Sequence, residues 1–251
     1  MRADVGVFGG SGFYTFLDDV ETHPVATPYG DPSSAVTIGT LGEVRVAFLP
    51  RHGPNHEFPP HRVNYRANVA AMRELGVRAL LAPFAAGSLR PTIHPGDFVV
   101  VDQLVDRTSG RADTFYDTFE DGPTHVSLAD PYDDNLRREF TAAATELGIT
   151  VHDRGTVVVV QGPRFSTRAE SEWYRSQGWD VINMTQYPEA ALAREANIPY
   201  GAVALVTDYD TGLEGMPGVE PVTQEQVFGF FEENVHRVRD VLFAAIPRLG
   251  L

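Results

Sequence analysis

The stretch GAVALVTDYD (residues 201–210) joins an unbroken apolar run to a polar end. A strand with one face in water alternates apolar and polar residues, whereas a strand covered on both faces is apolar throughout. Residues 201–206 therefore predict a buried strand in a sheet that helices cover on both sides. In such sheets, ligands bind beyond the carboxyl ends of the strands. Thr207, Asp208 and Asp210, which follow the run, are the first candidates for a functional site.

Similar junctions recur along the chain. Strand-like runs span residues 3–8, 44–49, 78–84, 98–105, 156–160 and 180–182, and helical periodicity spans residues 62–75, 134–147, 167–177, 188–196 and 223–246. The polar segments GGSG (9–12), PRHG (50–53), GPRFS (162–166) and NMT (183–185) each follow a strand-like run. The sequence predicts an α/β fold with a single domain (residues 1–251), whose mixed, largely parallel sheet is flanked by helices.

The composition excludes several kinds of chemistry. The 251 residues include no cysteine, and all 20 basic residues are arginine. These absences exclude thiolate catalysis, disulfides, thiolate zinc sites, a P-loop lysine and a Schiff-base lysine. The net charge of −14 disfavours nucleic acid and anionic membranes as partners. Because the apolar runs are shorter than the roughly 20 residues of a membrane helix and the chain starts without a secretory signal, we expect a cytoplasmic protein.

Arg51 and His52 are candidates for an anion site, because a guanidinium offers a forked and permanent positive charge. The tight turn at residues 9–12 has backbone amides that are able to approach the same anion. From these residues alone, a plain strand–turn and a surface salt bridge of Arg51 remain open. Prolines beside His52, His56 and His61 argue against the continuous helix of a zinc-binding pair, so we expect no metal site.

Asp208 and Asp210 form the second candidate site. Two carboxylates spaced by two residues point to the same side of an extended strand. Beside an apolar pocket each raises the pKa of the other, and a carboxyl group with a raised pKa can deliver a proton to a leaving group. Two alternatives remain open from the residues alone: solvated surface carboxylates, and ligands of magnesium, for which a third carboxylate motif is lacking.

Several segments together resemble one family, the methylthioadenosine phosphorylase branch of the purine nucleoside phosphorylases. The matching segments are GGSGFY (9–14), PRHG (50–53), PHRVNYRAN (60–68), AGSL (86–89), PGDFVVVDQLVDRT (95–108), GPRFSTRAES (162–171), VINMT (181–185) and VTDYD (206–210). They occur in family order and span most of the chain, so the joint match is specific although each motif alone is weak.

The resemblance implies a homotrimer, or a dimer of trimers, that needs no cofactor. Inorganic phosphate, the co-substrate, would attack C1′ of a purine nucleoside and release the base and a pentose 1-phosphate. The resemblance assigns the phosphate site to Ser11, Arg51, His52, Phe84, Ala85 and Thr185. It assigns the nucleoside site to Phe165, Ser166, Asn183, Met184, Thr207, Asp208 and Asp210, together with His125 from a neighbouring subunit. Asp208 would protonate N7 of the purine, and Asp210 would accept from a 6-amino group, which favours adenine nucleosides.

Two residues depart from the family pattern. Phe84 stands where the family has a small hydroxyl residue that contacts phosphate, and Gln224 stands where it has an apolar neighbour of the methylthio group. Together with Ser166 at the base and Val227 on the same helix, Gln224 is expected to determine specificity. The 5′ group of the nucleoside is left open between methylthio, hydroxyl, deoxy and halogenated forms.

Three other functions remain alternatives. They are a purine nucleoside phosphorylase that prefers adenosine or a 6-oxopurine nucleoside, a nucleosidase that uses water, and a nucleoside-binding module without activity. A nucleosidase has no use for Arg51 and His52 at an anion site, and binding alone requires neither an anion site nor a proton donor. Adenine release, measured with and without phosphate, separates these functions.

Overall fold

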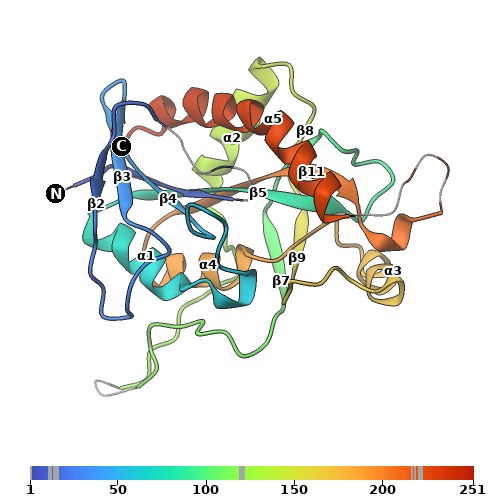
Figure 1. Cartoon of the computed structure of the whole chain (residues 1–251), viewed down its shortest axis with the longest axis horizontal. Coiled ribbons are helices and arrows are strands. Elements are labelled where there is room, and N and C mark those ends of the chain that lie inside the picture. Colours follow the sequence, from blue (N-terminus) through green and yellow to red (C-terminus); the bar gives the residue numbers. More distant parts are fainter. Residues whose placement is uncertain are drawn as a thin grey trace.

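One mixed sheet forms the centre of the protein (Figure 1). The computed structural model describes residues 2–10, 13, 17–118, 122–215, 217, 219 and 223–251. The strands are β1 (Val5–Gly9), β2 (Glu21–His23), β3 (Val36–Leu41), β4 (Val44–Pro50), β5 (Ala79–Ser88), β6 (Phe98–Val100), β7 (Gln103–Arg107), β8 (Val151–His152), β9 (Thr156–Val160), β10 (Val181–Asn183) and β11 (Tyr200–Tyr209). Within the described residues, six of the ten strand pairings are parallel and the other four are antiparallel. The predicted α/β fold with a mixed sheet is confirmed.

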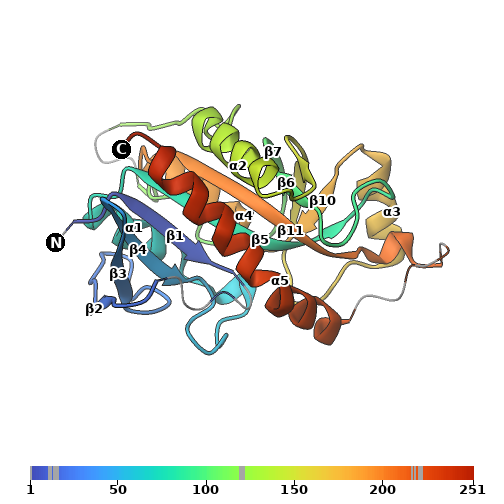
Figure 2. The ribbon, with the colours of Figure 1, turned by 90° about the horizontal axis from the view of Figure 1, so that it is seen from above.

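Helices cover both faces of the sheet (Figures 1 and 2). Helices α1 (Tyr65–Glu74) and α4 (Gln186–Glu195) pack on one face, α2 (Asp134–Glu146) and α5 (Gln224–Ala245) pack on the other, and α3 (Arg168–Ser176) lies at one end. Because both faces are covered, neighbouring strand residues enter different cores: Leu80 packs with the first helix pair and Leu81 with the second. This arrangement explains why the strands are apolar without alternation.

The helices begin and end where local chemistry predicts. Thr167 and Thr223 each form a capping box at the start of α3 and α5, in which the threonine side chain and a residue three positions later satisfy each other's backbone amides. Helix α1 ends at Leu75, and Gly76 follows with a φ of 73°, a conformation that favours glycine. None of the helices in the described part of the chain is long and apolar enough to cross a membrane.

Several elements differ in detail from the sequence predictions. Residues 98–105 form two strands, because the backbone amide and side chain of Asp102 bond to Gly155 and lead the chain from β6, which pairs with β11, to β7, which pairs with β9. The sequence did not predict β2 and β3, the two outermost strands on one side of the sheet, or the two-residue strand β8. Helix α4 is assigned to Gln186–Glu195, but Tyr187 within it is non-helical (φ −117°, ψ 133°), so the continuous helix starts at Pro188 as the sequence predicts.

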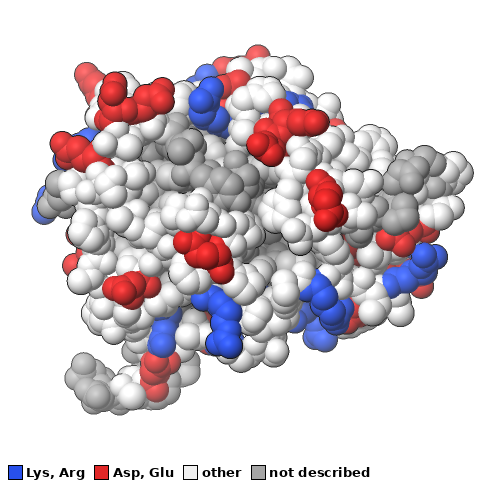
Figure 3. Space-filling view, viewed as in Figure 1, with Lys and Arg blue, Asp and Glu red and all other residues white. Residues whose placement is uncertain are grey.

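The charge of −14 is spread over the molecule. On the face shown in Figure 3, carboxylates lie apart from one another, arginines gather toward the lower edge, and much of the surface is uncharged. Such a surface has no single broad field of one sign on this side among the described residues.

The pairing along the long strand β5 leaves a gap between two neighbouring strands. On one edge of β5, β1 pairs with residues 79–81 and β10 pairs with residues 87–88, while β11 pairs along the opposite edge. Because β1 is parallel to β5 and β10 is antiparallel, the carboxyl ends of both strands point at residues 82–86. These residues of β5 therefore pass through a gap between two strand ends.

Candidate active site

A cavity of about 320 Å³ lies at this gap. Of the residues that the sequence placed in the site, its walls contain Arg51, His52, Phe84, Ala85, Phe165, Ser166, Asn183, Met184, Thr185, Thr207, Asp208, Asp210, Gln224 and Val227. His125 is exposed on the segment between β7 and α2 and does not line the cavity of its own subunit. Ser11 lies outside the described residues. Strand ends from distant parts of the chain thus bring most of the candidates together.

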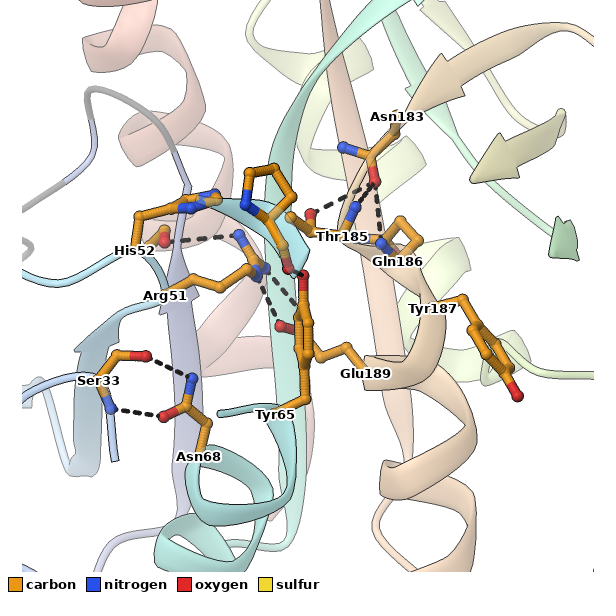
Figure 4. A network of polar contacts seen from close by, with 12 residues as sticks. Ser33, Arg51, His52, Tyr65, Asn68, Asn183, Thr185, Gln186, Tyr187 and Glu189 are labelled. Atoms are coloured by element: carbon orange, nitrogen blue, oxygen red, sulfur yellow. Dashed lines mark hydrogen bonds and ion pairs between the residues drawn. The ribbon is translucent and has the colours of Figure 1, made fainter. Parts of the chain in front are cut away.

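Arg51, which follows β4, is fully buried and forms a bidentate ion pair with Glu189 of α4 (Figure 4). Its Nε is 2.6 Å from one carboxylate oxygen of Glu189 and its Nη2 is 2.8 Å from the other. Nη1 lies 3.4 Å from the carbonyl oxygen of Gly9 and close to Gly10, a cavity residue. Burial alone would lower the pKa of Arg51, but the charge and hydrogen bonds of Glu189 raise it above the ordinary value. The salt bridge left open by the sequence therefore exists, but it is buried.

His52 is held as a neutral ring. Burial is the main cause that lowers its pKa to about 3, and the positive charge of Arg51 adds to it. Its Nδ1 lies 2.8 Å from the carbonyl oxygen of Phe58, and because a carbonyl only accepts, Nδ1 carries the hydrogen and Nε2 the lone pair. The ring of His56 stacks on His52 with 4.4 Å between centroids. Within the described ranges, no three His, Asp or Glu side chains gather as a metal site.

Asn183 shapes the turn after β10 instead of offering its amide to the cavity. Its Oδ1 accepts from the backbone N–H groups of Thr185 at 2.6 Å and of Gln186 at 2.9 Å (Figure 4). Its Nδ2 donates to the carbonyl oxygen of Ala85 at 3.2 Å. Asn183 therefore fixes Met184 and Thr185 against β5.

The same contact reveals the direction of the Ala85 amide. In an extended strand, the N–H and C=O groups of one residue point to the same edge. The carbonyl of Ala85 faces Asn183, so its N–H points into the gap between β1 and β10. Together with Nη1 of Arg51 and Oγ1 of Thr185, this N–H surrounds one end of the cavity, which we call the anion end. The buried ring of Phe84 forms part of its wall.

The opposite end of the cavity, called the carboxyl end, contains Asp208 and Asp210. Burial, together with the charge of Asp210, raises the pKa of Asp208 to about 6, although the Thr207 hydroxyl donates to Asp208 at 2.6 Å and opposes the shift. Burial also raises the pKa of Asp210. Among the described residues, Oδ2 of Asp210 and Oγ of Ser166 are buried without a hydrogen-bond partner. Such groups are costly unless a ligand satisfies them.

Gly87 allows Asp208 to approach the strand. A Cβ at Gly87 would stand 3.0 Å from Oδ2 of Asp208 and from Ile182. The register of β11 against β5 shifts between Val206 and Asp208, so the two strands leave room for the carboxylate at this point. Two features of the backbone therefore place the acid beside β5.

The first turns of α5 close a third side of the cavity, which we call the helix side. Gln224, Val227 and Phe228 line it, and the ring of Phe228 meets the ring of His56 edge to face at 5.1 Å between centroids. Gln224 is exposed as well as lining the cavity. The helix side is thus apolar except for one amide and one imidazole.

The sequence did not point to Glu189, offered His56 only as a metal ligand, and offered Phe228 only as the alternative to Gln224. Glu189 is fully buried within QYPEAALARE, where apolar residues surround it. A carboxylate on an otherwise buried helix face signals a buried cationic partner, because Glu is almost never fully buried unless paired. No sequence pattern pointed to His56 as a cavity residue. Its place depends on the turn after β4, where its φ is 55°.

Comparisons with known proteins agree with this geometry. The model of the Phosphorylase superfamily matches residues 4–247. The S-methyl-5′-thioadenosine phosphorylase of Mycolicibacterium smegmatis is 56% identical over 96% of this chain and 90% of its own length. The purine nucleoside phosphorylase of Streptomyces coelicolor is 51% identical over 99% of this chain and 90% of its own. A solved structure of methylthioadenosine phosphorylase from Schistosoma mansoni, in complex with adenine, has a TM-score of 0.93 at 38% identity and covers 99% of this chain and 92% of that one.

Proposed function

Because the chain belongs to the phosphorylase superfamily, we propose that it catalyses the phosphorolysis of a purine nucleoside. The substrate class is a 6-aminopurine nucleoside such as S-methyl-5′-thioadenosine, in accord with the names of two of the three relatives. One observation carries the proposal: a single cavity has hydrogen-bond donors at its anion end and protonatable, buried carboxyl groups at its carboxyl end. Phosphorolysis requires this pairing, whereas nucleoside binding alone does not.

Phosphate occupies the anion end in this proposal. Nη1 of Arg51, the N–H of Ala85 and Oγ1 of Thr185 donate to its oxygens, and Ser11 joins them as the sequence predicts. Bound there, phosphate faces the ribose beside Met184 and stabilises the positive charge that develops at C1′. A phosphate oxygen forms the new bond to C1′ as the bond from C1′ to N9 breaks, and the electron pair of that bond leaves with the purine.

Asp208 supplies the proton that the leaving purine needs at N7. A carboxyl group with a pKa of about 6 is partly protonated near neutral pH, as a general acid must be. Asp210 and Ser166 read the edge of the base, because each has a buried atom that awaits a partner. A carboxylate accepts from a 6-amino group and repels a 6-oxo oxygen, so adenine is favoured over hypoxanthine.

A second candidate is a phosphorylase that prefers adenosine, and Gln224 is the observation that favours it. An unpaired amide against a methylthio group is unfavourable, whereas a 5′-hydroxyl can pair with it. If Gln224 instead turns to solvent, Val227 and Phe228 offer the apolar surface that methylthio prefers. The ratio of catalytic efficiencies for the two substrates decides: Gln224→Val shifts the ratio toward methylthioadenosine only if Gln224 reads the 5′ group.

We further propose a homotrimer in which His125 completes the nucleoside site of a neighbouring subunit, because this exposed residue lies away from its own cavity. Purine salvage in the cytoplasm is the proposed setting, since the reaction frees a purine base for reuse. Both proposals come from the sequence resemblance.

The decisive experiment measures release of base from methylthioadenosine, adenosine, 5′-deoxyadenosine and inosine, each with and without phosphate. We expect adenine release that depends on phosphate and little hypoxanthine from inosine. Arg51→Ala should raise the KM for phosphate far more than the KM for nucleoside. Release without phosphate would identify a water-using nucleosidase, and an unchanged phosphate KM in Arg51→Ala would refute the anion site.

A further inference from the structure

We propose that Glu189 is a positioning residue of the anion end, which sets the direction of the Arg51 guanidinium toward phosphate. The proposal rests on the proposed function, because it takes phosphate as the ligand of Arg51. Glu189 is fully buried and does not line the cavity. Glu189 therefore does not contact the ligand, and it acts on phosphate either through Arg51 or through the field of its own charge.

Nη1 is the one guanidinium nitrogen of Arg51 that Glu189 does not contact. Glu189 takes Nε and Nη2 through two short, parallel contacts at 2.6 and 2.8 Å. A planar guanidinium held by one edge has its other nitrogen fixed in direction. That nitrogen is Nη1, whose contact in the protein is a long one of 3.4 Å to the carbonyl oxygen of Gly9. Glu189 thus fixes the direction of Nη1, which lies beside the cavity residue Gly10; Figure 4 shows the pairing of Arg51 with Glu189.

Glu189 is itself held from more than one element. It lies at the start of α4, one turn after the Asn183 turn that shapes the anion end. The hydroxyl of Tyr200, on β11, donates to its Oε1 at 2.7 Å and also lies 3.1 Å from Oε1 of Gln186. The carboxylate therefore joins the end of β4, the start of α4 and the start of β11 at one point.

A positioning role and a purely electrostatic role of Glu189 predict opposite changes in phosphate binding when its carboxylate is removed. The negative charge of Glu189 stands close to the anion end, so if charge alone mattered, removing it would strengthen phosphate binding. If Glu189 positions Arg51, removing one of its two contacts lets the guanidinium turn, and phosphate binding weakens. The direction of the change in phosphate KM therefore separates the two roles.

The test is Glu189→Gln in the full chain, which keeps the size of the side chain but places an amide N–H against the guanidinium. We expect the phosphate KM to rise about tenfold or more, the scale for misplacing a binding group, while the nucleoside KM changes less than about threefold. Tyr200→Phe keeps both charges and removes one contact to Glu189, so a smaller rise in phosphate KM is expected. This second variant tests the proposal even where Glu189→Gln does not fold.

Glu146→Gln is the matched control. It breaks another bidentate pair between Glu and Arg, formed with Arg248 on the surface, and should leave both KM values unchanged. In the Arg51→Ala background, Glu189→Gln should add no further rise in phosphate KM, because its partner is gone. A lowered or unchanged phosphate KM, an equal rise in both KM values, or an added rise in the Arg51→Ala background would overturn the proposal. Adenine release without phosphate from the unaltered protein would instead refute the proposed function.

Discussion

In the proposed mechanism, Asp208 is the proton donor for the leaving purine. Replacing it with Asn removes the proton donor and should lower turnover by about 100-fold or more, the usual scale for a general acid. Burial raises the pKa of Asp208 to about 6, and the acid works only while it holds its proton. The kcat/KM for nucleoside, measured at saturating phosphate, should therefore fall as pH rises above about 6.

Asp210→Asn is the comparison for this prediction, since it should weaken discrimination against inosine while keeping most of the turnover. In Asp208→Asn the fall above pH 6 should vanish, which separates the titration of Asp208 from that of phosphate itself. Near-full turnover in Asp208→Asn would place the proton donor elsewhere.

If phosphate binds at the anion end as proposed, Phe84 offers it no hydrogen bond where a hydroxyl side chain would. A hydrogen bond to a charged group contributes about 1.5–3 kcal/mol, so Phe84→Thr should lower the KM for phosphate about tenfold. The ring is fully buried, and its loss should also lower the free energy of unfolding by roughly 3 kcal/mol. Kinetics at varied phosphate and thermal unfolding measure the two effects.

The matched control is Phe84→Val, which has the shape of Thr without the hydroxyl. Phe84→Val should destabilise the protein to a similar extent. Its phosphate KM should stay at the value of the unaltered protein, whereas Phe84→Thr should lower it. Equal KM values in the two variants would show that the N–H of Ala85 and the other donors already satisfy phosphate.

Site residues at strand ends were predictable from the sequence. Residues that hold these side chains in place without lining the cavity were not. Arg51 follows the strand β4 and Asp208 lies at the end of β11, both after apolar runs, and the structure places both in one cavity. Glu189 is separated from Arg51 by 138 positions, and no local pattern links the two. Nor does the sequence reveal that the amide of Asn183 is used on backbone groups, because that depends on how β10 meets β5.

At the level of elements, long helices and buried strands were predictable, whereas short edge elements were not. Strand β9 coincides with the predicted residues 156–160, because five apolar or β-branched residues between turns permit little else. Strands β2 and β3 lie at the edge, where pairing partners rather than an apolar pattern decide the structure. The break between β6 and β7 depends on contacts of Asp102 with Gly155, which are distant in sequence.

The start of α5 links helix stability to the helix side of the cavity. Thr223 accepts from the backbone N–H of Gln226 at 3.2 Å, one turn before Val227. Thr223→Ala should lower the free energy of unfolding by about 1 kcal/mol, the usual effect of losing such a cap. Because the first turn then frays, the nucleoside KM should rise while the phosphate KM stays unchanged.

Asp133→Ala is the control for this element. Asp133 caps α2 by accepting from two backbone amides and lies away from the cavity, so its loss should destabilise the protein without changing either KM. Equal KM values for Thr223→Ala and the unaltered protein would show that the cap does not hold the helix side in place.

On the scale of the whole molecule, the cavity exists because β5 is longer than β1 and β10, the two strands that share one of its edges. Strands β1 and β10 pair with its two ends and leave residues 82–86 between them, so backbone donors face a ligand instead of a strand. The sequence predicted a run at residues 78–84 but not its extension to Ser88. The gap is a property of topology, which a single stretch of sequence does not encode.

His125 provides the prediction that concerns the assembled molecule. If it completes the site of a neighbouring subunit, then sedimentation should give a trimer at assay concentration, and His125→Ala should raise the nucleoside KM although the residue is absent from its own cavity. Mixed oligomers sharpen the test. In a hybrid of His125→Ala and Asp208→Asn subunits, some sites combine an intact Asp208 with an intact His125 from the neighbour. At nucleoside concentrations well below the KM of His125→Ala, the activity of the hybrid should therefore exceed that of either parent. A fully active monomer, or hybrids no more active than their parents, would show that each subunit completes its own site.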